Sequence, residues 1–479
     1  MTSQTGPKTA ENLRLSLAID RAMPAYVMVP FDVPAKTTCI TLTYDYPKSD
    51  NCIIDLGIGD PDMTDFPSEG GIAGWSGGAR REIFIATNMA TPGYHPGIKE
   101  GTWHVILGLH RVPDKPVTVK IGISFDFAPR VVAQPVSLPN ASSRGPSWYC
   151  GDLHCHTHHS DAKGSAAVLH ATAKREGLDF LAVSDHNTTT AHTAYFDHVS
   201  SSEMVFVPAY EFTTERGHGN IFGARKVEDF RVRNDRDVME MIGRIRANGH
   251  LFSVNHDKPN IPWNYTLPEI DCMEVWHAPW LAGNHVSLER YQARLAQGQR
   301  ITAVGGSDFH QPAVADNGNL ATLARPCTFL WCEELSPNGI LDALRTGRSF
   351  VTESPDGPRL ILNAGGVGHG GEITGASTIR LSYNATDAAG DILEIWDATG
   401  CIFVAPIRDA LERGSLELTG ALGFLRGQIV AGNSRANIVA TAQAHVAAGK
   451  GGRLDWSSAI DQPVLRCLTS PIYLARHHG

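Results

Sequence analysis

One stretch of this sequence, residues 152–161, reads DLHCHTHHSD and sets His154 and His156 two positions apart. In an extended strand, alternate side chains point to the same face, so these two imidazoles can converge on one ion while Cys155 faces away. Asp161 follows shortly after them. A single H-x-H pair is also compatible with two polar residues at the end of a strand, so the downstream sequence has to distinguish the two interpretations.

Downstream, short apolar runs typical of strands repeatedly end in residues that bind metals. The run at residues 178–183, LDFLAV, is followed by Ser184, Asp185 and His186. Further runs of the same kind end at Glu211, His256, His277, and Asp308 with His310.

Helical patterns separate these runs, at residues 165–176, 235–248 and 286–297, and each is followed by a glycine. Glycine just past the last helical residue suits a left-handed C-terminal cap. Strands that alternate with helices predict a parallel sheet, and in a barrel of such units the carboxyl ends of the strands open on one face. We therefore expect one pocket that contains His154, His156, His186, Glu211, His256, Asp308 and His310.

The middle of the chain, from about residue 148 to about residue 356, resembles the PHP (polymerase and histidinol phosphatase) superfamily of metal-dependent hydrolases, and within it the CehA/McbA-like branch. The resemblance rests on segments that occur in family order: DLHCHTHHSD, AVSDHN, PAYEFT, GHGNIFG, VNHDKP, VGGSDFH and LRTGRSFVT. It implies an α/β fold, a distorted (β/α)7 TIM-like barrel, with two or three divalent metal ions.

The resemblance also implies which residues would bind each ion. The expected ligands are His154, His156 and Asp308 for the first ion, His218 and His256 for the second, Asp161, His186 and His310 for the third, and Glu211 as a bridge between the first two. His218 lies in a glycine-rich segment with no strand-like run before it, so a solvated loop histidine is the alternative. Mixed histidine and carboxylate ligands suit Zn, Mn or Fe.

This ligand set predicts hydrolysis. A carboxylate that bridges two ions lets them share a water and lowers the pKa of that water, so that hydroxide exists near neutral pH. The hydroxide would be the nucleophile, while the positive charge would polarise the scissile P=O or C=O group. We expect cleavage of an ester bond in a small molecule, with a phosphoester first, because a cluster of ions can hold the oxygens of a phosphoryl group.

Two alternatives stay open. The CehA/McbA-like branch resembles enzymes that cleave aryl carbamates and related carboxyl esters, and aromatic residues near the expected rim either line an apolar leaving-group pocket or belong to the core. These residues are Trp263, Tyr265, Trp276 and Trp280. The other alternative is a non-catalytic metal-binding scaffold, which the complete ligand set disfavours.

Further residues have candidate roles beside Glu211. Asp185 would act as a catalytic acceptor for a ligand histidine or a substrate group, or would cap a strand end. His277 would donate to the leaving group or would close a loop. Lys258 and Arg325 would clamp an anionic substrate, with solvated surface charge as the alternative.

The length of 479 residues predicts about three domains. Residues 1–147 contain alternating runs such as VTVKIGI at 117–123, punctuated by glycine and proline, and predict a β-sandwich-like domain that ends in a Pro/Ser-rich linker at 131–146. Residues 357–479 are expected to form a second β-rich domain, with a strand at 437–442 among others.

Composition narrows location and partners. The chain has no run of about 18 apolar residues and begins MTSQTGPK, without the layout of a secretion signal, so a cytoplasmic protein is expected. Nine cysteines without paired spacing indicate reduced thiols. A net charge of −9 without basic runs argues against nucleic acid as a partner. We expect a small-molecule substrate and no membrane contact, and leave a homo-oligomer open.

Overall fold

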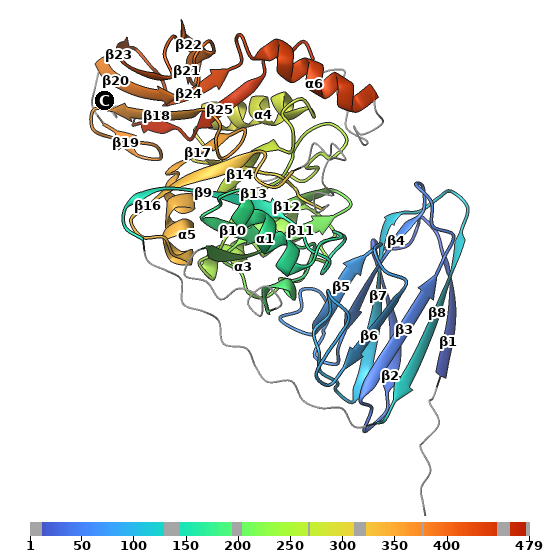
Figure 1. Cartoon of the computed structure of the whole chain (residues 1–479). Coiled ribbons are helices and arrows are strands. Elements are labelled where there is room, and N and C mark those ends of the chain that lie inside the picture. Colours follow the sequence, from blue (N-terminus) through green and yellow to red (C-terminus); the bar gives the residue numbers. More distant parts are fainter. Residues whose placement is uncertain are drawn as a thin grey trace, which may run out of the picture.

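The computed structural model describes residues 12–128, 144–193, 204–266, 269–310, 322–374, 378–447 and 460–475. An all-β N-terminal part, an α/β central part and a mostly β C-terminal part follow one another along the chain (Figure 1). Most of the predicted linker at 131–146 lies outside the described residues.

The N-terminal part is a sandwich of two four-stranded antiparallel sheets, ordered β1-β8-β3-β6 and β2-β7-β4-β5. Side chains alternate along each strand, so Val105 and Leu107 of β7 meet Ile40 and Leu42 of β3 in the core between the sheets. The strands are β1 (Asn12–Ile19), β2 (Tyr26–Val33), β3 (Cys39–Asp45), β4 (Ile53–Gly59), β5 (Ile72–Gly77), β6 (Glu82–Ala86), β7 (Gly101–Arg111) and β8 (Val117–Asp126).

The second sandwich sheet packs its outer face against the central part. Trp75 and Tyr26 from this face lie 4.7 Å and 5.9 Å from Phe230 between ring centroids. Beside them, the backbone N–H of Ser68 donates to Asp229 Oδ2 at 2.9 Å. Buried apolar and polar contacts therefore fix the sandwich to the central part.

The central part contains two groups of parallel strands, joined by one strand of opposite direction. The first group is β9 (Ser147–Cys155), β10 (Phe180–Val183) and β11 (Val205–Thr214), and the second is β13 (Leu251–Val254), β14 (Cys272–His277) and β15 (Thr302–Gly306). Between them, β12 (Gly217–Phe222) is antiparallel to both β11 and β13. On the far side of β9, β16 (Cys327–Cys332) and β17 (Ser349–Thr352) are also antiparallel.

These strands do not form the closed (β/α)7 TIM-like barrel that we expected. The sheet runs β15-β14-β13-β12-β11-β10-β9-β16-β17, and within the described residues β15 has no hydrogen-bonded ladder with β9. The segment after β15 nevertheless reaches β9, because Asp308 N donates to His154 O at 2.8 Å and Cys155 forms an isolated bridge with Phe309. The result is a mixed sheet curved enough to bring its β15 edge back to β9 at one end.

The three predicted helices are present as α1 (Ala166–Arg175), α3 (Asp235–Ala247) and α4 (Asn284–Ala296). At their N-termini, Ser165 caps α1 and Asn234 caps α3 by accepting backbone N–H groups. Gly177 and Gly249, just past α1 and α3, have φ of +72° and +78°, as left-handed C-terminal caps require. A further helix, α5 (Pro337–Thr346), lies before β17. Among the described residues, no helix has the length and apolar character needed to cross a membrane.

The C-terminal part continues the central sheet. Strand β17 pairs with β25 (Leu465–Thr469), and the order then runs to β24 (Phe424–Val430), β21 (Ile392–Asp397) and β22 (Gly400–Pro406). A three-stranded sheet of β18 (Arg359–Ala364), β20 (Thr378–Thr386) and β23 (Leu411–Thr419) packs on it, and β19 (Glu372–Ile373) and β26 (Ile472–Leu474) form a short parallel pair.

The predicted strand at 437–442 is wrong, because these residues lie in α6 (Arg435–Ala447). The segment ANIVATAQAHVA contains the β-branched residues that suggested a strand, but five of its twelve residues are alanine, the strongest helix former.

Candidate metal centre

The structure brings all nine expected ligands together where the central strands end. His154 lies in β9 and His156 directly after it, Glu211 lies in β11, and His218 in β12. The other five expected ligands lie in segments that follow strands at the same end of the sheet: Asp161, His186, His256, Asp308 and His310. Their positions agree with a role as metal ligands.

His154, His156 and Asp308 form the first compact group. Asp308 Oδ1 lies 3.2 Å from His154 Nε2 and 2.9 Å from His156 Nε2. One ligand atom from each residue lies within 4.8 Å of the others. The set equals the three ligands expected for the first ion.

Glu211 lies at the centre of the cluster and is fully buried. Its Oε1 is 3.3 Å from His154 Nε2, 3.4 Å from His218 Nδ1 and 3.4 Å from His256 Nε2. Its Oε2 is 2.8 Å from His186 Nδ1. One carboxylate thus faces histidines of all three expected ligand sets, which is the position required of a bridging ligand.

The third group consists of Asp161, His186 and His310, with His156 close enough to join it. Asp161 Oδ1 lies 3.0 Å from His310 Nε2 and 3.5 Å from His186 Nε2. The Asp161 side chain is 47% exposed, so this side of the cluster opens toward solvent.

The placement of His218 differs from the expectation of a loop. It lies in β12, where it pairs with Thr213 of the antiparallel neighbour β11, two residues beyond Glu211. The glycines around it hid the strand from sequence reasoning. They are needed there, since a Cβ at Gly219 would lie 2.5 Å from the ring of Phe252.

Buried polar atoms of the cluster fit bound cations. Within the described part of the chain, His154 Nε2, His156 Nε2, Glu211 Oε2 and Asp308 Oδ1 are buried and have no hydrogen-bond partner. An unsatisfied buried polar atom costs about 1–3 kcal/mol, and here several converge on the same space. Imidazole nitrogens and carboxylate oxygens are ligands for Zn, Mn or Fe, so divalent ions would satisfy these atoms together.

The protonation states also suit metal binding. Burial raises the pKa of Glu211, but the positive charges of His154, His218 and His186 outweigh it and hold that pKa well below its ordinary value. Burial, with the charges of neighbouring histidines, lowers the pKa of His156 to about 3. The carboxylate of Glu211 is therefore ionised and the imidazole of His156 neutral, as ligands must be. Burial lowers the pKa of His154 and of His186, but the charges of neighbouring carboxylates outweigh it and raise both, that of His186 to about 9, so a bound cation would displace these protons.

Glu274 is a residue of this site that sequence reasoning missed. It lies in β14 and is 2% exposed, with Oε1 2.8 Å from His154 Nδ1, while Oε2 accepts the backbone N–H of His256 at 2.9 Å. A carboxylate on the distal ring nitrogen fixes the tautomer and orientation of a ligand histidine. The sequence feature that could have revealed Glu274 is that it is the one acidic residue inside the apolar run CMEVW.

Two further side chains orient ligands in the same way. Asn255 Nδ2 donates to Glu211 Oε1 at 2.9 Å, and Thr213 Oγ1 lies 2.6 Å from His186 Nδ1. Asn255 directly precedes the expected ligand His256, and Thr213 lies two residues after Glu211 in β11, so their closeness to ligands in the sequence could have suggested this role.

Asp185, expected as a catalytic acceptor, has its oxygens engaged elsewhere. It accepts hydrogen bonds from Thr157 N at 2.8 Å, Thr157 Oγ1 at 2.6 Å and Ser160 Oγ at 2.5 Å. It therefore stabilises the segment between His156 and Asp161, as in the capping alternative. His277 does lie in the cluster, with Nε2 3.0 Å from Asp308 Oδ2, and its buried Nδ1 has no partner among the described residues.

The two expected substrate clamps are engaged by the protein itself. Lys258 is fully buried and donates through Nζ to His277 O and Asn284 Oδ1, both at 3.1 Å. Arg325 donates to Glu176 Oε2 at 2.6 Å near the surface. Neither contact aims the cation at the cluster, so nothing here supports a role in substrate binding. The four aromatic residues considered for a leaving-group pocket instead belong to the core, and each is at most 7% exposed: Trp263, Tyr265, Trp276 and Trp280.

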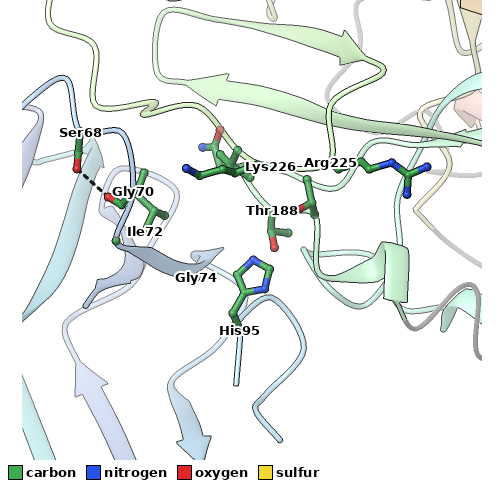
Figure 2. A pocket seen from close by; sticks show the side chains of 12 residues that line it. Ser68, Gly70, Ile72, Gly74, His95, Thr188, Arg225 and Lys226 are labelled. Atoms are coloured by element: carbon green, nitrogen blue, oxygen red, sulfur yellow. Dashed lines mark hydrogen bonds between the residues drawn. The ribbon is translucent and has the colours of Figure 1, made fainter. Parts of the chain in front are cut away.

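The loop after His186 meets the N-terminal sandwich. Thr188 Oγ1 donates to Gly93 O at 3.3 Å, and a cavity of about 100 Å³ lies beside this contact. Figure 2 shows His95 of the sandwich and Thr188 of the central part facing each other in it. The sandwich thus reaches the immediate surroundings of the cluster.

No protein-family model and no curated protein matches the chain. Solved structures give similarities at low identity. A two-domain protein from Bacteroides vulgatus, described as containing a predicted PHP-like metal-dependent phosphoesterase, is 15% identical with a TM-score of 0.38, over 63% of this chain and 94% of that chain. The neighbours thus include a PHP-like protein.

Two other solved structures are similar over smaller shares of this chain. A protein from Bifidobacterium adolescentis, provisionally described as a metal-dependent phosphoesterase, is 16% identical with a TM-score of 0.27, over 37% of this chain and 90% of that chain. An amidohydrolase from Chromobacterium violaceum is 13% identical with a TM-score of 0.25, over 34% and 88%. Because these TM-scores are below 0.5, the function has to be inferred from the residues of the site.

Proposed function

We propose that the protein is a metal-dependent hydrolase that cleaves a phosphoester bond of a small molecule. The observation that carries the proposal is the position of Glu211, fully buried and within 3.4 Å of His154, His218 and His256 through one oxygen. A buried carboxylate that faces several histidines is costly unless cations join them. A cluster of this kind supports hydrolysis more directly than a scaffold role, which needs no such arrangement.

Two or three divalent ions, when bound, would supply an activated water and positive charge for the oxygens of the ester. The chain's own residues hold and orient the ligand atoms. Glu274 fixes the ring of His154 and Asn255 fixes the carboxylate of Glu211, so the ligand atoms are held before substrate arrives.

His277 is the candidate proton donor to the leaving alcohol. Its Nε2 lies beside Asp308 Oδ2 at 3.0 Å, on the same side of the cluster as the first group of ligands. Burial, with the positive charge of Lys258, lowers the pKa of His277 to about 4. At neutral pH the imidazole of His277 is therefore uncharged, so it would first take a proton from the attacking water and then pass that proton to the leaving alcohol.

A structural reason favours phosphoesters over aryl carbamates as substrates in this proposal. The four aromatic residues that would have formed an apolar leaving-group pocket are buried in the core, so no described group of the site favours an aryl substrate. The rim instead offers the partly exposed polar residues Asp161, His186 and His310. We further propose Zn, Mn or Fe as the ions, since all three accept this ligand set.

The test combines metal content with a substrate panel. Plasma mass spectrometry of the purified protein should give two or three equivalents per chain, and Glu211→Gln should lose most of them, while Glu240→Gln, an exposed change in α3, should not. The loaded protein should cleave p-nitrophenyl phosphate or bis-p-nitrophenyl phosphate faster than 1-naphthyl methylcarbamate. Preference for the carbamate would reverse the order of substrates, and metal binding without any hydrolysis would favour the scaffold.

A further inference from the structure

The second sandwich sheet carries two polar side chains on the face that meets the central part. In β7, Leu107 points into the core of the sandwich, whereas Ile106 points outward into the apolar core between the sandwich and the central part. Because side chains alternate along a strand, Gly108 and His110 also lie on the outward face. Asp55 of β4 pairs directly with Gly108, and paired residues project to the same face. Asp55 and His110 therefore lie next to each other and form a polar end of this face.

This polar end faces the metal centre. Asp55 lies close enough to His186 and Asp161 for their charges to act on its carboxyl, and His110 is influenced in the same way by His218 and His186. The two sandwich residues are thus near the second and third groups of expected ligands, which include the partly exposed Asp161.

The sandwich cannot slide freely relative to the cluster, because contacts hold it on more than one side of this face. Arg80 donates through Nη1 to Ser160 O at 3.0 Å, one residue before the expected ligand Asp161. Gly93 N donates to Thr190 Oγ1 at 3.1 Å. Together with the packing of Trp75 on Phe230, these bonds give Asp55 and His110 a defined position.

Neither polar side chain is engaged by the protein. In the part of the chain that the structure describes, Asp55 and His110 make no hydrogen bond and no ion pair. The nearest cation of the sandwich, Lys48, donates its ammonium group to Gly78 O at 2.6 Å. A half-buried carboxylate without a donor is uncommon in a folded protein, and it is expected where the donor comes with a ligand.

We propose that the N-terminal sandwich forms one wall of the substrate site, where Asp55 and His110 bind the alcohol portion of the phosphoester through its hydroxyl or ammonium groups. This inference rests on the proposed function. Burial raises the pKa of the Asp55 carboxyl to about 7, so above that pH it is ionised, only accepts hydrogen bonds, and selects leaving groups that carry donors. The exposed Glu215 also acts on Asp55, which adds negative charge to this wall and favours an ammonium group.

The test compares leaving groups. O-phosphoethanolamine carries an ammonium group, glycerol 2-phosphate carries hydroxyls, and p-nitrophenyl phosphate carries neither. In Asp55→Asn, the ratio of kcat/KM for a donor-bearing ester to kcat/KM for p-nitrophenyl phosphate should fall about tenfold or more, mainly through KM. A fall limited to phosphoethanolamine identifies ammonium as the group bound, and a fall for both esters identifies hydroxyls as well.

Asp45→Asn is the matched control, because Asp45 lies on the other sandwich sheet and is exposed. It should leave the ratio unchanged. His110→Asn provides a second, independent variant if Asp55→Asn lowers the yield of folded protein, and it should shift the ratio in the same direction. Unchanged ratios in both wall variants, with the wild type active on phosphoesters, would overturn the inference. A wild type that cleaves no phosphoester would instead overturn the proposed function.

Discussion

The carboxylate of Glu274 should determine how tightly the cluster binds metal, although it is not itself one of the expected ligands. It accepts from His154 and from the backbone of His256, one bond through each oxygen. In Glu274→Gln, a single amide oxygen replaces the two carboxylate oxygens, so one of the two donors would face an NH₂ group. The imidazole of His154 would also lose the negative charge that makes its other nitrogen a better ligand.

The expected loss is about 10- to 100-fold in metal affinity, which corresponds to about 1.4–2.7 kcal/mol. Competition against a chelator of known affinity measures it directly, with Zn and with Mn. Glu240→Gln serves as the control, since Glu240 pairs with Arg236 on the exposed face of α3. An unchanged affinity in Glu274→Gln, with the fold intact by circular dichroism, would refute the reasoning that Glu274 orients the ligand.

Three other changes test separate parts of the structure. A Cβ at Gly306 would lie 2.3 Å from His154 Cβ, so Gly306→Ala should displace that ligand and lower metal content, as measured by mass spectrometry. Trp75→Ala should destabilise the protein by about 3–5 kcal/mol, because Trp75 is 3% exposed and packs on Phe230; urea denaturation checks this. Burial lowers the pKa of His369 to about 4 from an ordinary 6.5, so only the unfolded state takes up its proton between these values, and stability falls as the pH drops from about 6.5 to about 4. His369→Gln should remove about 2 kcal/mol of that pH dependence between pH 6.5 and pH 4.5, measured by denaturation at these two pH values.

Sequence reasoning located the candidate ligands that the structure brings together because their chemistry is local. A histidine or carboxylate directly after an apolar run, as at His186 or Asp308, is visible in a few consecutive letters. The supporting residues were harder to find. Glu274 lies within a strand, where an acidic residue normally signals an exposed face, and only the fold reveals that this face is the interior of the cluster.

The direction and pairing of strands were not predictable in the same way. Alternating or apolar runs mark a strand but not which neighbour it pairs with, so the antiparallel strand β16 could not be distinguished from a member of a parallel barrel. Contacts between distant segments were equally invisible. Nothing in the sequence around Asp55 indicates that it lies near His186, because the docking of Trp75 on Phe230 brings them together.

The shared sheet of the central and C-terminal parts has a consequence for how the protein is made. Strand β17 is completed at Thr352, but its partner β25 begins only at Leu465, about 110 residues later. Until the ribosome has delivered that strand, the nascent chain exposes the unpaired edge of β17, which is a site for association with other chains. We therefore expect the central part to complete its folding late in synthesis, and we expect fragments that end before β25 to aggregate.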